Sequence, residues 1–176
     1  NPVHGLFGFS PYSSSSAFAG NSLLISPERL AAEGFFQHRN LPDPLPGDQV
    51  DFTQAKHLRE KLFSRVFPAF RRGKNRLLFD RFCREQADWL DDYALFRVLK
   101  QNHAGKPWHH WPRAFRDRHP DALEKIGHSL HQELEEIKIL QYLFFTQWSS
   151  LKHYAGTKQI RFIGDLPLYV AHDSAD

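Results

Sequence analysis

Residues 130–165 have the sequence LHQELEEIKILQYLFFTQWSSLKHYAGTKQIRFIGD, and this stretch decides the fold class. In residues 130–155 apolar side chains recur every three or four positions, which predicts an amphipathic helix of about seven turns. Gly156 is expected to end that helix. Residues 159–163 predict a strand, with Asp165 just after its end. Helix, loop, strand and a carboxylate at the strand's carboxyl end form the repeating unit of an α/β barrel, although a doubly wound sheet has the same local pattern.

The chain divides into three regions by composition. Residues 1–47 are rich in Gly, Pro and Ser, and this density of turn-forming residues excludes long regular elements. A short helix is expected after Ser26, which can cap it with Pro27 in the first turn. Residues 48–127 are expected to form a helical subdomain, and residues 128–176 contain the long helix and the strand.

Several helices of the middle region are predicted from apolar spacing. Residues 52–66 follow a period close to 3.6, and Pro68 is expected to end this helix. Apolar residues between positions 77 and 89 indicate a second helix, and residues 93–99 indicate a third. A short helix is expected at residues 121–126.

The charges favour a solvated surface over a nucleic-acid partner. The chain has 23 Lys and Arg against 20 Asp and Glu, and the formal net charge is +3. The two signs interleave through the middle of the chain, whereas a nucleic-acid-binding face would concentrate basic residues. No run of about 18 apolar residues occurs, so no membrane partner is predicted.

Cysteine and methionine usage bears on compartment and chain length. Cys83 is the single cysteine, so no intrachain disulfide can form. This fits a reducing compartment, and we expect a cytoplasmic protein. Cys83 is interpreted as a small half-buried apolar residue and not as a nucleophile. The chain begins with Asn1 and contains no methionine, so we expect it to be an excerpt of a longer protein.

Neither a metal site nor a catalytic triad is predicted. Four histidines gather near two tryptophans in the middle region: His103, His109, His110 and His119. They do not have a zinc-binding spacing, so we interpret them as surface residues and expect no metal and no cofactor. His172 and Asp173 are adjacent, and neighbours on one short segment cannot face one another as a Ser-His-Asp triad requires.

Two residues are candidates for contact with a sugar. Tyr12 follows Pro11 in a loop-like segment, where an exposed ring can stack on the C–H face of a glucose unit. The alternative is a tyrosine that packs its loop onto the core. Asp165, after an apolar strand, would need partners such as sugar hydroxyls or a cation. The alternative is an aspartate that caps a turn.

Longer strings of residues resemble the amylomaltases, glycoside hydrolase family 77 of the α-amylase clan. SPY at residues 10–12, SAFAGN at 16–21 and LLI at 23–25 resemble the loop after the second barrel strand of that family. WLDDYALF at 89–96, LK at 99–100, Gly105, Trp108 and WP at 111–112 resemble its inserted helical subdomain. QW at 147–148, LKHYA at 151–155 and IGDLPLYVAHDSAD at 163–176 resemble its third-strand region. The resemblance covers essentially the whole chain in the same order.

The resemblance implies an α/β fold, part of a (β/α)8 TIM barrel that carries a mostly helical inserted subdomain. It implies a 4-α-glucanotransferase that moves α-1,4-glucan segments between maltooligosaccharides, starch or glycogen by a retaining double displacement. Tyr12 matches the family's tyrosine that stacks on the donor glucose, and Ser10 lies in the same loop. Asp165 matches an aspartate in the floor of that subsite, where it orients the sugar.

The family's catalytic nucleophile and acid/base residues come from later strands, beyond the counterpart of Asp176. No catalytic residue is therefore expected in this chain. The alternative to an active glucanotransferase is that the chain as given is an inactive fragment with part of a glucan-binding surface. Two positions depart from the family pattern: Ser13 stands where Gln is frequent, and Gln159 stands where Gly is frequent.

Overall fold

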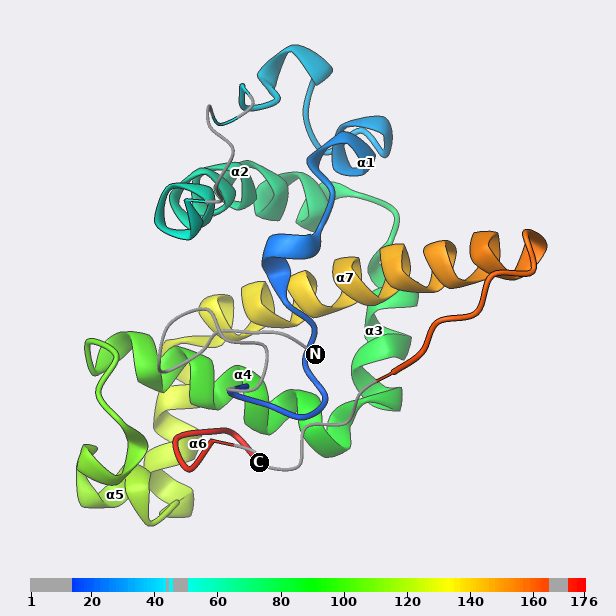
Figure 1. Ribbon diagram of the computed structural model, residues 1–176. Coiled ribbons are helices and arrows are strands. Elements are labelled where there is room, and N and C mark those ends of the chain that lie inside the picture. The colour runs from blue at the N-terminus through cyan, green and yellow to red at the C-terminus, as the bar shows by residue number, and fades with distance from the viewer. Residues whose placement is uncertain (1–13, 44, 46–50, 165–170) are drawn as a thin grey trace.

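The computed structural model describes residues 14–43, 45, 51–164 and 171–176, and these form helices joined by loops (Figure 1). Within these ranges no strand is formed. In chain order the elements are the 3₁₀ turn η1 Ser22–Leu24, α1 Pro27–Ala32, the 3₁₀ turn η2 His38–Asn40, α2 Phe52–Arg72, α3 Arg76–Glu85, α4 Ala87–Asn102, the 3₁₀ turn η3 Trp108–His110, α5 Arg113–Arg116, α6 Pro120–Ser129 and α7 His131–Thr157.

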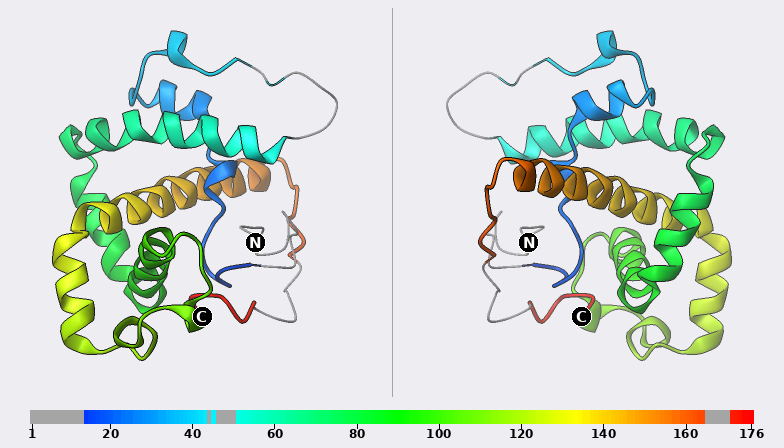
Figure 2. Two further views of the ribbon diagram at one scale, coloured as in Figure 1. Left: turned by 90° about the vertical axis from the view of Figure 1, so that its left-hand side faces the viewer. Right: turned by 90° about the vertical axis from the view of Figure 1, so that its right-hand side faces the viewer.

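Helix α7 confirms the long helix and forms the centre of the molecule. It has 27 residues and runs between α1 and α2 on one side and α4, α5 and α6 on the other, as the views in Figures 1 and 2 agree. Ile139 and Leu143 are almost fully buried, one turn apart on the same face. Gln141, on the stripe that the sequence predicts, is 2% exposed, whereas Ile139 and Leu143 lie on another side of α7. The helix is therefore buried on more than the predicted side.

The end of α7 differs from the prediction. The helix continues past Gly156, and the residue with left-handed backbone is Gln159, with φ of 57°. The Ile160 amide donates to the Ala155 carbonyl at 2.9 Å, and the Gln159 amide donates to the Gly156 carbonyl at 3.0 Å. These two bonds are those of a Schellman motif, in which the left-handed position usually holds glycine.

Helix α2 continues for a further turn past Pro68, so the prediction that Pro68 ends it is wrong. Proline removes one hydrogen bond of a helix, and tertiary contacts compensate here. The Phe70 ring is buried and packs edge-on against Phe79 and Tyr142, with centroids 5.3 and 5.7 Å apart. Arg71 forms ion pairs of 2.8 and 3.0 Å with two glutamates of α7.

The predicted second helix is in fact two helices. Helix α3 ends before Gln86, whose φ of −114° and ψ of 12° lie outside the helical region, and α4 begins after it. The Trp89 indole N–H donates to the Gln86 side chain at 2.9 Å and fixes this break. Trp89 therefore belongs to α4 and not to the preceding helix, and the predicted helix at residues 93–99 is the middle of α4.

The two short helices are confirmed. Pro27 begins α1, and the Ser26 hydroxyl accepts a hydrogen bond from the Arg29 amide at 3.2 Å, as an N-cap should. Helix α6 begins at Pro120 and includes the predicted residues 121–126.

The strand predicted at residues 159–163 is not formed. Residues 160–164 have no regular secondary structure, and Ile163 is 98% exposed. A strand needs a second strand to pair its amides and carbonyls, and the described residues offer none. The Phe162 ring instead packs on Trp148 of α7 at 5.0 Å. The barrel part of the fold prediction therefore has no counterpart among the described residues.

Three apolar clusters form the core. The largest joins α1, α2, α3 and α7: Ile25, Leu30, Leu62, Phe63, Val66, Phe70, Phe79, Ile139 and Leu143. A second joins Ala19 to Trp89, Leu90 and Tyr93 of α4. A third joins Phe96, Leu99 and Trp111. The division of the chain at residues 47 and 127 stays a prediction.

Candidate functional site

Two segments far apart in sequence lie side by side, residues 14–21 and residues 171–176. The Ala175 amide donates to the Ser15 carbonyl at 2.9 Å. The Asp176 carboxylate accepts hydrogen bonds from the Ser16 hydroxyl, at 3.3 Å, and from the Ala17 amide. The structure thus joins the segment that follows Tyr12 to the segment that follows Asp165.

The serine-rich segment is folded by its own hydroxyl groups. Ser16 is 1% exposed, and its hydroxyl accepts from the amides of Phe18 and Ala19 at 3.1 and 3.2 Å. The Ser14 hydroxyl donates to the Ser16 carbonyl at 2.5 Å. Such local bonds let a short hydroxyl side chain replace a backbone partner and fix a turn.

Two buried amide side chains of α7 hold the chain between Gly20 and Ser26. Gln141 accepts from the Gly20 amide at 2.8 Å and donates to the Gly20 carbonyl at 3.1 Å. Gln147 bonds the amide and carbonyl of Ser26 in the same way, at 2.7 and 3.4 Å. Gly20 has no room for a side chain, because an added Cβ would lie closer than 3.0 Å to the ring of Phe144.

The C-terminal segment is held by α4 and by η3. The Asp173 carboxylate is paired with the Lys100 ammonium and accepts from the Trp108 amide at 3.0 Å. The Trp108 indole N–H donates to the His172 carbonyl at 2.7 Å, and the two rings stack with centroids 5.4 Å apart. Asp173 is 6% exposed and the Lys100 side chain is 17% exposed, so the carboxylate of this ion pair is buried and the ammonium is partly buried.

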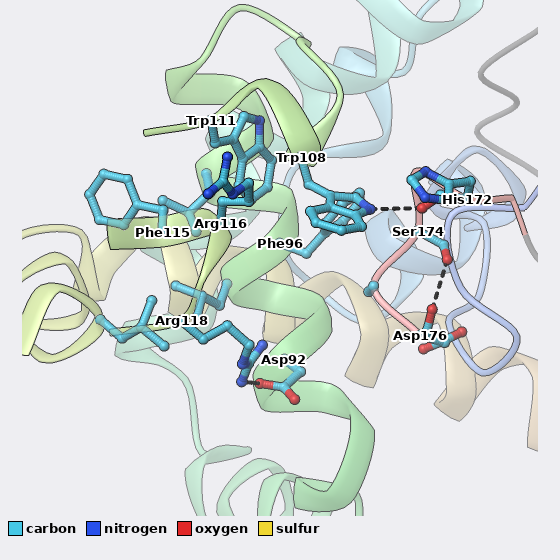
Figure 3. Close-up of a pocket in the computed structure, with 14 residues that line it drawn as sticks. Asp92, Phe96, Trp108, Trp111, Phe115, Arg116, Arg118, His172, Ser174 and Asp176 are labelled. Carbon is cyan, nitrogen blue, oxygen red and sulfur yellow. Dashed lines mark hydrogen bonds and ion pairs between the residues drawn. The ribbon is translucent and has the colours of Figure 1, made fainter. Parts of the chain in front are cut away.

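A cavity of about 260 Å³ lies beside this segment, between α4, α5 and residues 172–176 (Figure 3). Aromatic rings form much of its wall: Phe96, Trp108, Trp111 and Phe115. At its edge Arg118 donates to Asp92 at 2.6 Å. Aromatic faces beside charged and hydroxyl groups can contact a planar or sugar-like polar molecule.

The sequence-predicted contact residues Ser10, Tyr12 and Asp165 lie outside the described residues. His109, His110 and His119 are exposed, as expected, and His103 is half-buried and stacks on Trp111 at 5.5 Å. Within the described ranges no three His, Cys, Asp or Glu side chains are placed to hold a metal ion.

Cys83 behaves as predicted. Its side chain is half-buried and packs on two of the core clusters. Burial raises the pKa of the Cys83 thiol, so the thiolate that a nucleophile requires is disfavoured. In the part of the chain that the structure describes, no helix is long and apolar enough to cross a membrane.

Sequence reasoning missed the residues that hold the two segments. Gln141 falls on the apolar stripe that the sequence predicts for residues 130–155. A polar side chain in the middle of such a face was the available signal, because buried amides require partners. No local signal paired Lys100 with Asp173, which are 73 residues apart.

Comparison with known proteins places this arrangement in one family. The family model described as 4-alpha-glucanotransferase, glycoside hydrolase 77, matches residues 1–176. The 4-alpha-glucanotransferase of Synechocystis is 42% identical over 97% of this chain and 35% of its own length, and that of Thermus thermophilus is 40% identical over 97% of this chain and 34% of its own length.

A solved structure agrees. The amylomaltase of Streptococcus agalactiae in complex with acarbose superposes with a TM-score of 0.90 and 31% identity, over 98% of this chain and 36% of that one. The chain thus spans about a third of the length of the relatives that it matches. It belongs to the 4-alpha-glucanotransferases, glycoside hydrolase family 77.

Proposed function

We propose that this chain contributes to a 4-α-glucanotransferase that transfers α-1,4-glucan segments between maltooligosaccharides, starch or glycogen. The family match over residues 1–176 supports this activity. The structural neighbour from Streptococcus agalactiae is a complex with acarbose, which supports an α-glucan as the ligand. Within a whole protein of this kind, the described helices would pack beside a (β/α)8 barrel, and we propose a cytoplasmic enzyme.

The observation that carries the proposal for the site is the junction of residues 14–21 with residues 171–176. Tyr12 precedes the first of these segments by two residues, and Asp165 precedes the second by six. The Ala175 amide donates to the Ser15 carbonyl at 2.9 Å. The segment that follows Tyr12 and the segment that follows Asp165 are therefore bonded to each other. This supports a shared sugar site.

In this site Tyr12 stacks on the donor glucose, because the C–H face of the sugar meets the electron-rich face of the ring. Asp165 accepts hydrogen bonds from sugar hydroxyls and orients the ring, and Ser10 lines the same loop. The reaction is a retaining double displacement: an aspartate attacks the anomeric carbon while a glutamic acid protonates the leaving oxygen. A second glucan's 4-hydroxyl oxygen then displaces the aspartate from that carbon, and the glutamate takes the hydroxyl proton. Those catalytic groups come from outside these 176 residues.

The test is release of glucose from maltotriose, with chromatography of the longer products. The full reading frame that contains these residues should release glucose and form maltopentaose and longer chains. The 176-residue chain alone should do neither, since the catalytic groups lie outside it. Activity of these 176 residues alone would overturn the assignment of the catalytic groups to other residues.

Site variants test the individual roles. Tyr12→Ala and Asp165→Asn should each lower kcat/KM for maltotriose by about a hundredfold, because both contact the sugar beside the bond that breaks. Ser10→Ala should have a smaller effect. Tyr154→Ala is the matched control, because Tyr154 is 59% exposed on α7, and it should leave kcat/KM unchanged. Wild-type kinetics in Tyr12→Ala would contradict the site.

A further inference from the structure

We propose that the Lys100–Asp173 ion pair is a positioning device of the helical part of the molecule. It holds residues 171–176 against residues 14–21, the two segments that follow the proposed sugar contacts Asp165 and Tyr12. The inference rests on the proposed function and goes further, since it assigns a role in sugar binding to α4. Lys100 and Asp173 act through the segments that they anchor, and neither is a catalytic residue.

The carboxylate of the ion pair is buried, and both of its oxygens have hydrogen-bond donors within the protein. The side chains of Lys100 and Asp173 are 17% and 7% exposed. One carboxylate oxygen of Asp173 faces the Lys100 ammonium and the other accepts from the Trp108 amide at 3.0 Å. Since both oxygens have donors within the protein, Asp173 is suited to hold a segment in place and not to contact a sugar.

A second set of contacts fixes the same segment next to the ion pair. Trp108 donates its indole N–H to the His172 carbonyl at 2.7 Å, and its ring stacks on His172. Figure 3 shows His172, Ser174 and Asp176 along one wall of the cavity, with Trp108 opposite His172. Residues 172 and 173 are therefore held by Trp108 of η3 through three contacts: the His172 carbonyl, the His172 ring and the Asp173 carboxylate.

Residues 173–176, which the ion pair anchors, are hydrogen-bonded in turn to residues 16 and 17. Three residues after Asp173, Asp176 accepts from the Ser16 hydroxyl at 3.3 Å and from the Ala17 amide, across 160 and 159 positions of sequence. A chain of contacts thus leads from Lys100 on α4 through residues 173–176 to the segment that follows Tyr12. A shift of about 1 Å in such a positioning shell can lower a rate a hundredfold.

A local stabilising role alone does not account for this arrangement. A buried ion pair contributes little net stability, because desolvation of both charges offsets their attraction. Such pairs instead favour one geometry over others in some proteins. Here the pair joins α4, which carries no predicted sugar contact, to a segment within eight residues of Asp165.

The experiment compares three variants in the full reading frame: Asp173→Asn, Lys100→Met and Lys100→Arg. Matched controls are Glu85→Gln and Arg81→Met, which break an exposed ion pair with side chains 62% and 65% exposed. Each protein is assayed with maltotriose and titrated with acarbose, at a temperature where circular dichroism shows it to be fully folded. Amide hydrogen exchange is measured over residues 14–21 and 171–176.

Asp173→Asn and Lys100→Met should weaken acarbose binding and raise KM by about tenfold each, with a smaller loss of kcat, since the catalytic groups lie elsewhere. Both should speed amide exchange in the two segments together. Lys100→Arg keeps the charge and should restore most of the affinity, whereas the two controls should match the wild type.

Four outcomes decide between the readings. Wild-type acarbose affinity and KM in Asp173→Asn, with only a lower melting temperature, would mean that the pair is structural and would overturn the inference. Faster exchange in residues 171–176 without any change in residues 14–21 would also overturn it, because the segments would not be coupled. An inactive wild-type protein would instead defeat the proposed function and the inference with it. Weaker binding with faster exchange in both segments supports it.

Discussion

Replacing Gln141 by methionine should loosen the segment from Ser14 to Ser26 by about 3 kcal/mol. Gln141 is 2% exposed and forms two hydrogen bonds with Gly20: it accepts from the amide at 2.8 Å and donates to the carbonyl at 3.1 Å. Loss of the side-chain partner leaves two buried backbone groups unpaired, at about 1–3 kcal/mol each. The methionine offsets part of this, because it has no amide to desolvate.

Methionine is chosen because it isolates the hydrogen bonds. It has the length of glutamine and a similar helix propensity, so neither a cavity nor a weaker helix should contribute to the change. Gln101→Met is the matched control, since Gln101 is exposed on α4. The assay is amide hydrogen exchange of the full reading frame, which reports the free energy of local opening.

Exchange of residues 14–26 should rise by about two orders of magnitude in Gln141→Met and stay unchanged in Gln101→Met, since about 1.4 kcal/mol corresponds to a factor of ten. Gln147→Met should have a similar effect that is confined to the part near Ser26. A rise of less than about twofold in Gln141→Met would refute the reasoning, because it would mean that other groups satisfy Gly20.

Three further predictions concern the backbone and the charges. Gln159→Gly should stabilise the end of α7 by about 1 kcal/mol, seen as a higher urea midpoint, because φ of 57° favours glycine; an unchanged midpoint would contradict this. Gly34→Ala should destabilise by about 1 kcal/mol through φ of 85° alone, since no atom lies within 4 Å of the added Cβ; a higher midpoint would contradict it. Burial opposes ionisation of Glu135, but hydrogen bonds from Arg71 and Arg76 outweigh it and lower its pKa below 4.5. The stability that ionised Glu135 contributes is therefore complete above pH 4.5 and is lost as the pH falls through the lower pKa of the folded state. Glu135→Gln should flatten that part of the plot of urea midpoint against pH. An equally steep plot in the variant would refute the assignment.

Local signals in the sequence were enough to predict α7 and α1. The apolar period of residues 130–155 depends only on neighbours within two turns, and the Ser26 cap depends only on the next three residues. The structure confirms both. Such elements can be predicted because the interactions that stabilise them are close in sequence.

The failures share the opposite cause. Pro68 was expected to end α2, but Phe70 is held by rings of α3 and α7, which the local pattern does not contain. The strand at residues 159–163 has the right composition and lacks a pairing strand among the described residues. Propensity is a weak prior where tertiary contacts decide the outcome.

The contacts that join the candidate site to the helices are long-range. Gln141 and Gln147 each bond a residue 121 positions away, and the Lys100–Asp173 pair spans 73 positions. Single-sequence reasoning could find a tyrosine and an aspartate suited to a sugar, but it could not say what fixes their loops. Loops bind ligands well only where a rigid scaffold positions them.

Anchoring a binding loop to helices changes which substitutions should affect function. Residues 14–26 are bonded at two points to α7 and at their start to residues 175–176, which follow a segment anchored to α4. Because each anchor is a buried polar group with its partner, loss of one leaves an unpaired group that the loop can satisfy only by moving. Substitutions on α4 and α7, at positions that no sugar reaches, should therefore appear first as changes in KM and ligand affinity, and those on the exposed faces of the same helices should not.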